Sequence, residues 1–194
     1  MSLHKQKVEM KKKEIIRSAA KTLQEKGFHG TTMEEIAAQL LMTKGSLYHY
    51  FKNKEDLLYH CHKIILEISI KKIEEILETE QSNTNKIEAI IRFHINLAIE
   101  ENAMFGLIDN PEHTFSKENF EKIRKRRSYY SRCIDKVIEQ GVENGEFRNI
   151  DIKMSRFIIL GSLNWIQQWY NPQGNRSPEE ISEYFVNKLL QTLK

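Results

Sequence analysis

The sequence predicts an all-α protein of about nine helices, and three observations lead to this prediction. Apolar residues recur at spacings of three and four, and no alternation of apolar and polar residues is long enough to predict a strand. Helix-capping patterns stand at several segment starts, as in Thr32 with Glu35 and in Ser177-Pro178 with Glu180. With only three prolines and eight glycines in 194 residues, long linkers are not expected.

Composition narrows the class of protein. No run approaches the roughly 18 consecutive apolar residues of a membrane span, and the first residues lack the apolar core of a signal peptide. The two cysteines form no disulfide framework, so we expect a cytoplasmic protein without membrane attachment. Residues 1–52 carry 10 Lys and Arg against 5 Asp and Glu, whereas the remainder has a net charge of −2. This asymmetry indicates a head that faces nucleic acid on a nearly neutral body.

The first predicted helix covers residues 8–26. Ile15 and Ile16 belong to its apolar stripe, and Gly27 follows as its stop. Three lysines at residues 11–13 precede the stripe. They form either a solvated basic terminus or a set of phosphate contacts, and the sequence leaves both open.

Two short helices separated by a tight turn are predicted within residues 31–51. In the second, residues 43–51, Leu47, Tyr50 and Phe51 face inward. The opposite face of this helix is short, holds no carboxylate and is rich in hydrogen-bond donors, so it fits a phosphate backbone and the floor of a major groove. The pattern predicts a helix-turn-helix with residues 43–51 as the recognition helix. The predicted DNA-binding residues are Thr31, Thr32, Thr43, Lys44, Gly45, Ser46, Tyr48, His49, Tyr50, Lys52 and Lys54.

The run of residues 27–58 resembles the signature of the TetR family of bacterial transcriptional regulators. KGSLYHYF at residues 44–51, followed by Lys54-Glu55, is the most specific part of the match. One departure lies in the turn, where the family usually has Ala-Gly-Val and this chain has Leu-Leu-Met, which puts Leu41 where a glycine would relieve a positive φ. The resemblance implies a three-helix DNA-binding domain at residues 1–52 and a helical ligand-binding and dimerisation domain at residues 53–194.

Helical patterns continue through the body. A long helix is predicted over residues 54–80, and the resemblance makes it the lever between head and body. Another predicted helix covers residues 151–170. Further helices are expected to begin at Asn85, Ser116 and Ser177, with a short apolar turn or helix over residues 103–109 that is closed by Pro111.

One apolar stripe near the C-terminus has two interpretations. It contains Ile158, Ser162, Trp165 and Trp169, with Gly161 beside it. These residues form either an intramolecular core or, as the resemblance implies, half of a four-helix interface in a homodimer. A two-fold dimer would double the contacts with a palindromic operator in double-stranded DNA.

A second and less specific resemblance concerns the effector. Asn164-Trp165, Trp169-Tyr170, Pro172 and Gly174 are similar to the C-terminal pattern of TetR-family regulators that respond to acyl-CoA thioesters. It implies a small apolar effector of the long-chain acyl-CoA type, and five cations in residues 122–127 are either its phosphate site or a solvated helix face. The predicted ligand-binding residues are Phe93, Met104, Phe105, Arg126, Tyr130, Cys133, Trp165 and Trp169.

Catalysis, a cofactor and a metal site are not predicted. His60-Cys61-His62 resembles a metal cluster, but residues i and i+2 of a helix point to different sides. Cys133 and His94 fit a buried thiol and a satisfied core histidine better than a nucleophile and its base. We therefore predict a ligand-responsive repressor that a small effector releases from its operator. The alternatives are an acyl-CoA-binding or acyl-transfer protein and a non-specific DNA-binding protein.

Overall fold

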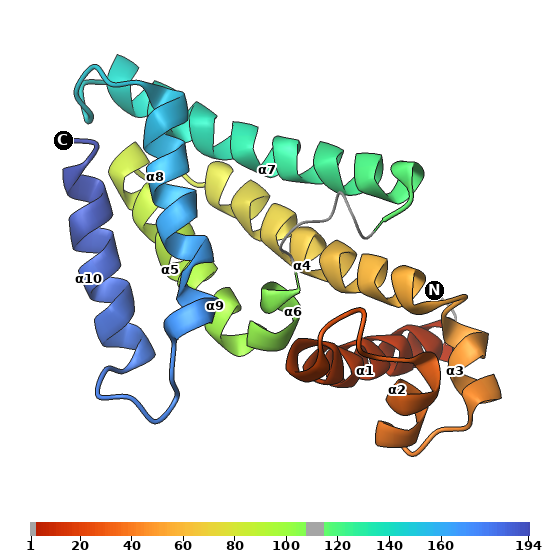
Figure 1. Ribbon diagram of the computed structural model, residues 1–194. Helices are drawn as coiled ribbons and strands as arrows, with labels where there is room; N and C mark the ends of the chain where they lie inside the picture. Colours follow the sequence, from red (N-terminus) through yellow and green to blue (C-terminus); the bar gives the residue numbers. More distant parts are fainter. Residues whose placement is uncertain (1–2, 108–114) are drawn as a thin grey trace. The chain divides into compact units, whose positions relative to one another are not determined.

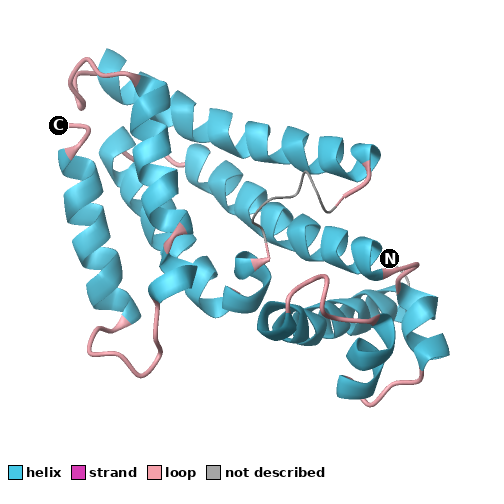
Figure 2. Ribbon diagram, in the orientation of Figure 1, coloured by secondary structure: helices cyan, strands magenta, loops and turns pink. Residues whose placement is uncertain are grey.

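The computed structural model describes residues 3–107 and 115–194, and all regular elements among them are helices, as Figure 2 shows. The prediction of an all-α fold is confirmed. In chain order (Figure 1) the helices are α1 Leu3–Lys26, α2 Met33–Gln39, α3 Lys44–Tyr50, α4 Lys54–Leu77, α5 Asn83–Glu100, α6 Asn102–Gly106, α7 Lys117–Glu143, α8 Ile152–Asn164, α9 Ile166–Trp169 and α10 Pro178–Gln191. The single helix predicted over residues 151–170 is divided at Trp165 into α8 and α9. Asp109 and Pro111 lie outside the described residues. Within the described part of the chain, no helix combines the length and the apolar character that a membrane crossing requires.

The chain divides into two compact units. The first consists of the described residues of Met1–Ile65 and Ala103–Ile123, and the second of Leu66–Asn102 and Arg124–Lys194. Helices α4 and α7 therefore each contribute residues to both units. The boundary between residues 52 and 53, which separates the chain by function, stays a prediction.

The first unit is organised around the apolar stripe of α1. Ile15, Ile16 and Leu23 of this helix are fully buried, as are Leu47 of α3 and Phe51 at its C-terminal cap. Helix α2 packs against both α1 and α3. Complete burial of a side chain of this size contributes about 1.5–3 kcal/mol, so this core fixes the position of two helices that are too short to be stable alone.

The second unit is organised around α5. Helix α10 lies along α5, and α8 and α9 pack against it as well (Figure 1). The predicted start of α5 at Asn85 is wrong by two residues, because the helix begins at Asn83 and Ser82 is its cap. The carboxylate of Glu146 accepts hydrogen bonds from the backbone N–H groups of Asn83 and Thr84, at 2.9 and 2.8 Å. This contact satisfies two of the donors that every helix start leaves unpaired.

Candidate DNA-binding surface and effector site

Helix α3 has the form expected of a recognition helix. Thr43 caps it by accepting a hydrogen bond from the N–H of Ser46 at 3.1 Å, and Phe51 is its C-terminal cap. Leu47 is completely buried, whereas Tyr48 keeps 41% of its surface exposed. The residues of α3 and its N-cap that face solvent are Thr43, Lys44, Gly45, Ser46, Tyr48 and His49. The predicted polar face therefore points to solvent, while the buried Leu47 anchors the opposite face of the helix in the core.

A carboxylate from a neighbouring helix, which the pattern of α3 does not reveal, lies beside this face. Glu34 of α2 forms an ion pair with Lys44, and the Lys44 ammonium also lies 5.7 Å from the centroid of the Tyr48 ring. Lys44 lowers the pKa of Glu34, and Glu34 in turn raises the pKa of Lys44. The absence of a carboxylate holds for α3 itself and not for its surroundings, because α2 packs against α3. Any phosphate that approaches Lys44 therefore competes with Glu34.

The turn between α2 and α3 confirms the expectation of a positive φ. Leu41 has φ 52°, and the backbone N–H groups of Leu41 and Met42 donate to the carbonyl oxygens of Ala38 and Ala37 at 3.1 and 2.9 Å. This is the hydrogen-bonding pattern with which helices commonly end on a left-handed residue. Leu41 is 97% exposed, so its side chain contributes little packing to offset the backbone conformation.

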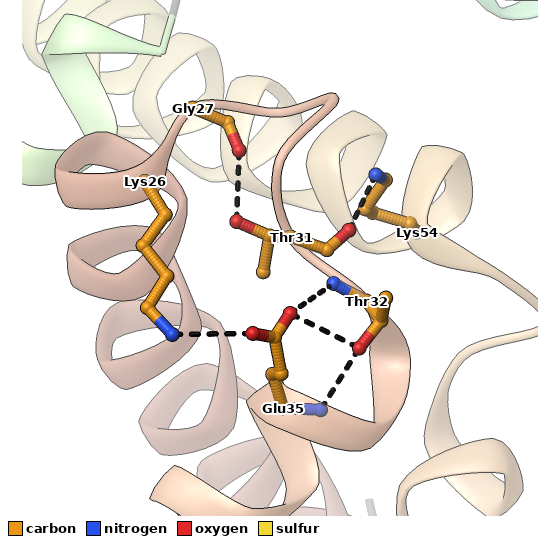
Figure 3. Close-up of polar contacts among 6 residues, drawn as sticks. All are labelled: Lys26, Gly27, Thr31, Thr32, Glu35 and Lys54. Atoms are coloured by element: carbon orange, nitrogen blue, oxygen red, sulfur yellow. Dashed lines mark hydrogen bonds and ion pairs between the residues drawn. The ribbon is translucent and has the colours of Figure 1, made fainter.

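Side-chain hydrogen bonds and one ion pair hold the loop between α1 and α2 (Figure 3). Thr32 and Glu35 form a reciprocal capping box, and Glu35 also pairs with Lys26 at 3.2 Å. Thr31 is only 1% exposed, and its hydroxyl donates to the carbonyl oxygen of Gly27 at 2.8 Å. Thr31 is therefore a buried residue that stabilises the loop by this hydrogen bond, whereas Thr32 remains exposed.

Lys54 contacts the same loop from the first turn of α4. Its ammonium donates to the carbonyl oxygen of Thr31 at 2.6 Å (Figure 3) and to that of Phe28, and it lies 4.4 Å from the centroid of the Phe28 ring. An ammonium has three N–H donors, so at most one is left for a phosphate. Of the two remaining residues predicted to contact DNA, Tyr50 is half-buried and Lys52 is exposed.

The lysines at residues 11–13 have different surroundings. Lys12 is half-buried, donates to Nε2 of His60 at 3.0 Å and lies 5.2 Å from the centroid of the Phe51 ring. Burial lowers the pKa of His60, and the neighbouring charge of Lys12 lowers it further. Lys12 thus connects α1 to α4, whereas Lys11 and Lys13 are exposed.

Among the predicted effector residues, Tyr130 and Cys133 of α7 lie together in the core of the second unit. His94 of α5 joins them, with Nδ1 3.4 Å from the Tyr130 hydroxyl and Nε2 3.1 Å from Oδ1 of Asn164. The prediction of a satisfied core histidine is confirmed. Burial lowers the pKa of His94 to about 4 and raises the pKa values of Tyr130 and Cys133. All three side chains are uncharged at neutral pH.

The other predicted effector residues are divided between the two units. Met104 and Phe105 are buried in α6 and belong to the first unit. In the second unit, Phe93 is half-buried on α5 and Arg126 pairs with Glu67 at 3.4 Å. Trp169 is partly exposed and stacks on Phe185 of α10, with 6.2 Å between ring centroids.

Helix α8 presents an apolar stripe to solvent. Ile158 and Trp165 are 49% and 63% exposed, so these members of the predicted C-terminal stripe are not intramolecular core. Met154 and Phe157 extend the stripe and are similarly exposed. These two residues were not among the predicted members of the stripe. Met154 lies four residues before Ile158 and Phe157 four residues before Gly161, which is the spacing of one helix face and was a usable signal.

Comparisons with known families agree with this arrangement. Residues 15–61 match the family described as bacterial regulatory proteins, tetR family, and residues 80–193 match the tetracyclin repressor-like C-terminal domain. The second match alone covers more than half of the chain.

Individual relatives are similar over most of their length. The chain is 27% identical to the fatty acid metabolism regulator protein of Bacillus subtilis over 152 residues, which is 78% of each protein. It is also 27% identical to the HTH-type transcriptional repressor KstR2 of Mycolicibacterium smegmatis, over 89% of this chain and 85% of that protein.

Solved structures show the same similarity. The regulator PfmR from Thermus thermophilus superimposes with a TM-score of 0.85 at 27% identity, covering 93% of this chain and 98% of that chain. AibR in complex with isovaleryl coenzyme A and operator DNA superimposes with a TM-score of 0.82 at 28% identity, covering 92% and 97%. The chain therefore belongs to the TetR family of bacterial regulatory proteins.

Proposed function

We propose that this protein is a cytoplasmic, homodimeric transcriptional repressor that binds a palindromic operator with α3 and is released by an effector of the acyl-CoA class. The observation that carries the proposal is the exposed polar face of α3, with Lys44, Ser46 and Tyr48 presented by a buried Leu47. A helix of this kind reads about one half-site in a major groove, so a two-fold pair is needed for a palindrome. The exposed stripe of α8 supplies an apolar surface for that pairing.

The roles of individual residues follow from their exposure. We assign base contacts to Thr43, Lys44, Gly45, Ser46, Tyr48 and His49, and a phosphate contact to Lys52. Thr31 supports the loop from inside, and Lys54 has at most one donor available for DNA.

Two relatives support the effector class. One is a fatty acid metabolism regulator by name, and AibR was solved with isovaleryl coenzyme A and operator DNA. In the present chain, Tyr130, Cys133 and Phe93 supply apolar surface and one hydroxyl for such an effector. Arg126, which pairs with Glu67 at 3.4 Å, supplies a cation for a nucleotide phosphate. Repression by this mechanism requires that the effector bind the operator-free conformation more tightly than the operator-bound one.

The experiment begins with selection of bound duplexes from a random library, followed by native mass spectrometry of the purified protein. We expect a two-fold symmetric consensus, a dimer, and loss of the operator complex on addition of isovaleryl-CoA or palmitoyl-CoA. If no sequence is enriched among the bound duplexes, the protein is a non-specific DNA-binding protein instead. Thioester turnover that Cys133→Ala abolishes would identify an acyl-transfer protein.

A further inference from the structure

Two side chains restrict the ammonium of Lys44, the first residue of α3. The carboxylate of Glu34 on α2 forms an ion pair with it, and the ring of Tyr48, one helical turn further along α3, has its centroid 5.7 Å from Nζ. The side chains of Glu34 and Lys44 are 53% and 59% exposed. The pair therefore belongs to the candidate DNA-binding surface and is accessible to a bound duplex.

The carboxylate of Glu34 affects phosphates and bases differently. A phosphate is negatively charged, so Glu34 repels it and competes with it for the Lys44 ammonium. The edge of a guanine carries no net charge and presents two neighbouring acceptors, O6 and N7, in the major groove. Because an ammonium has three N–H donors, Lys44 can keep one on Glu34 and direct the others to such an edge.

Glu34 and Tyr48 also limit the freedom of the Lys44 side chain. A lysine has a flexible four-carbon stem and loses rotamer entropy when it is fixed against a base. In the free protein the ion pair and the ring already hold the ammonium at the start of α3. This ordering favours only the complex in which Lys44 keeps that position, and a phosphate that draws the ammonium away gains nothing from it.

We propose that Glu34 is a positioning residue for sequence specificity, which withholds Lys44 from phosphates and directs it to a guanine in each half-site. The inference rests on the proposed function, because it concerns which base the same DNA-binding surface selects. Specificity is a difference between two affinities, so it increases when the competing complexes are weakened. Glu34 lowers the affinity for every duplex, but it lowers it most for a duplex without a guanine opposite Lys44.

The first test compares two dissociation constants by fluorescence anisotropy. One is the Kd for the duplex enriched from a random library, and the other is the Kd for a duplex with both half-sites scrambled. In Glu34→Gln both values should fall, and the value for the scrambled duplex should fall about three- to fivefold further. The matched control is Glu25→Gln on α1, an exposed carboxylate whose removal should leave the ratio of the two values unchanged.

The outcomes of this test separate the inference from the proposed function. If the wild type enriches an operator but Glu34→Gln leaves the ratio unchanged, the role of Glu34 is refuted and the proposed function stands. If the wild type enriches no sequence, both fail. An equal change of the ratio in Glu25→Gln would show a general charge effect and would also refute the role of Glu34.

A double-mutant cycle tests whether Glu34 acts through Lys44. Lys44→Met removes the donors and keeps an unbranched apolar side chain. In the Lys44→Met background, Glu34→Gln should no longer change the ratio of the two Kd values. A change as large as in the wild-type background would mean that the carboxylate acts on DNA directly, which would overturn the proposal.

Repeating the selection with the variants tests the base. The wild type should enrich a guanine at one position of each half-site. Lys44→Met should lose that preference, and Glu34→Gln should weaken it while the other positions of the consensus persist. Retention of the full consensus by Lys44→Met, or loss of a base other than guanine, would refute the assignment.

The ion pair itself can be tested without DNA. Lys44 is the main cause that lowers the pKa of Glu34 in the folded protein. An NMR titration of the Glu34 carboxyl carbon should therefore give a higher pKa in Lys44→Met than in the wild type. Equal values would show that the pair does not form in solution and would overturn the proposal.

Discussion

Nε2 of His94 and Oδ1 of Asn164 lie 3.1 Å apart and connect α5 to the last residue of α8. On the other side of the ring, the hydroxyl of Tyr130 lies 3.4 Å from Nδ1. A carbonyl acceptor at Nε2 and a hydroxyl donor at Nδ1 are both satisfied by the neutral tautomer that carries its proton on Nε2. Protonation of Nδ1 would remove the acceptor for Tyr130 and place a charge in the core of the second unit.

This geometry predicts a loss of stability in mild acid. Burial lowers the pKa of His94 to about 4 in the folded protein, although the Asn164 hydrogen bond opposes the shift. Because the unfolded chain keeps a pKa of about 6.5, it binds the extra proton first, and the free energy of unfolding falls as the pH drops from about 6.5 towards 4. We expect a decrease of about 2 kcal/mol between pH 7.5 and pH 5 from this group.

Urea unfolding at the two pH values measures this decrease, with His94→Gln as the variant and His29→Gln as an exposed control. The pH dependence should be shallower in His94→Gln than in the control. Equal slopes in both variants would show that His94 is not the group responsible.

The turn before α3 predicts a stabilising substitution. Leu41 adopts φ 52° and is 97% exposed. A left-handed conformation costs a residue with a Cβ roughly 1–2 kcal/mol, and glycine avoids this strain at some cost in unfolded-state entropy. Leu41→Gly should therefore raise the free energy of unfolding by up to about 1 kcal/mol. Leu41→Ala, which keeps the Cβ, should change it little, and a destabilised glycine variant would mean that the leucine side chain itself contributes.

The ion pair beside α3 predicts a gain in DNA affinity. Glu34→Gln should free Lys44 for a phosphate or a base and remove a negative charge that repels the duplex. The operator Kd should fall, and the slope of log K against log salt should steepen by about 1 for each phosphate newly contacted. A salt titration by fluorescence anisotropy measures both quantities. Glu25→Gln in α1 is the matched exposed control, and identical effects in the two variants would indicate a general charge effect.

The cap of α5 predicts a second stability effect with its own pH range. Burial acts to raise the pKa of Glu146, but hydrogen bonds from the backbone of Thr84 and Asn83 outweigh it and lower the pKa to about 2. A lowered carboxyl pKa stabilises the fold above the unfolded value of about 4.3, and this contribution is lost as the pH falls towards 2. Glu146→Ala should cost about 1 kcal/mol at pH 7, as the loss of a helix cap does. Thermal unfolding of Glu146→Ala, with Glu143→Ala as the exposed control, measures this loss. Equal midpoint temperatures in the two variants would refute the stabilising role of the cap.

The cysteines predict low thiol reactivity, which separates a regulator from an acyl-transfer protein. Burial raises the pKa of Cys61 to about 12 and also raises the pKa of Cys133. Because the thiolate is the reactive form, both thiols should react with Ellman's reagent only after unfolding. Rapid labelling of one thiol in the native protein would support the alternative, and Cys133→Ser would identify which thiol reacts.

Much of the helical structure could be predicted because its signals are local. Three helix caps each lie within one helical turn. They are the capping boxes of Thr32 with Glu35 and of Ser177 with Glu180, and the Thr43 side chain that accepts from the N–H of Ser46 at the start of α3. The apolar spacing that predicted Leu47 and Phe51 as buried residues is equally local. Even the backbone conformation of Leu41 followed from a departure at one position of a known motif.

Tertiary structure decided which polar groups meet across long stretches of sequence. Glu146 caps α5 from 63 residues away, and Lys12 reaches His60 from 48 residues away. Tertiary packing also decides that Thr31 is buried and that Trp165 is exposed. It likewise brings the Lys54 ammonium to the carbonyl oxygens of Phe28 and Thr31. The sequence alone determined most of the helices, the caps that form within one helical turn, and the family resemblance. Side-chain partners across the fold depend on how those helices pack, because a pattern within one turn carries no information about the groups that packing brings to its surface.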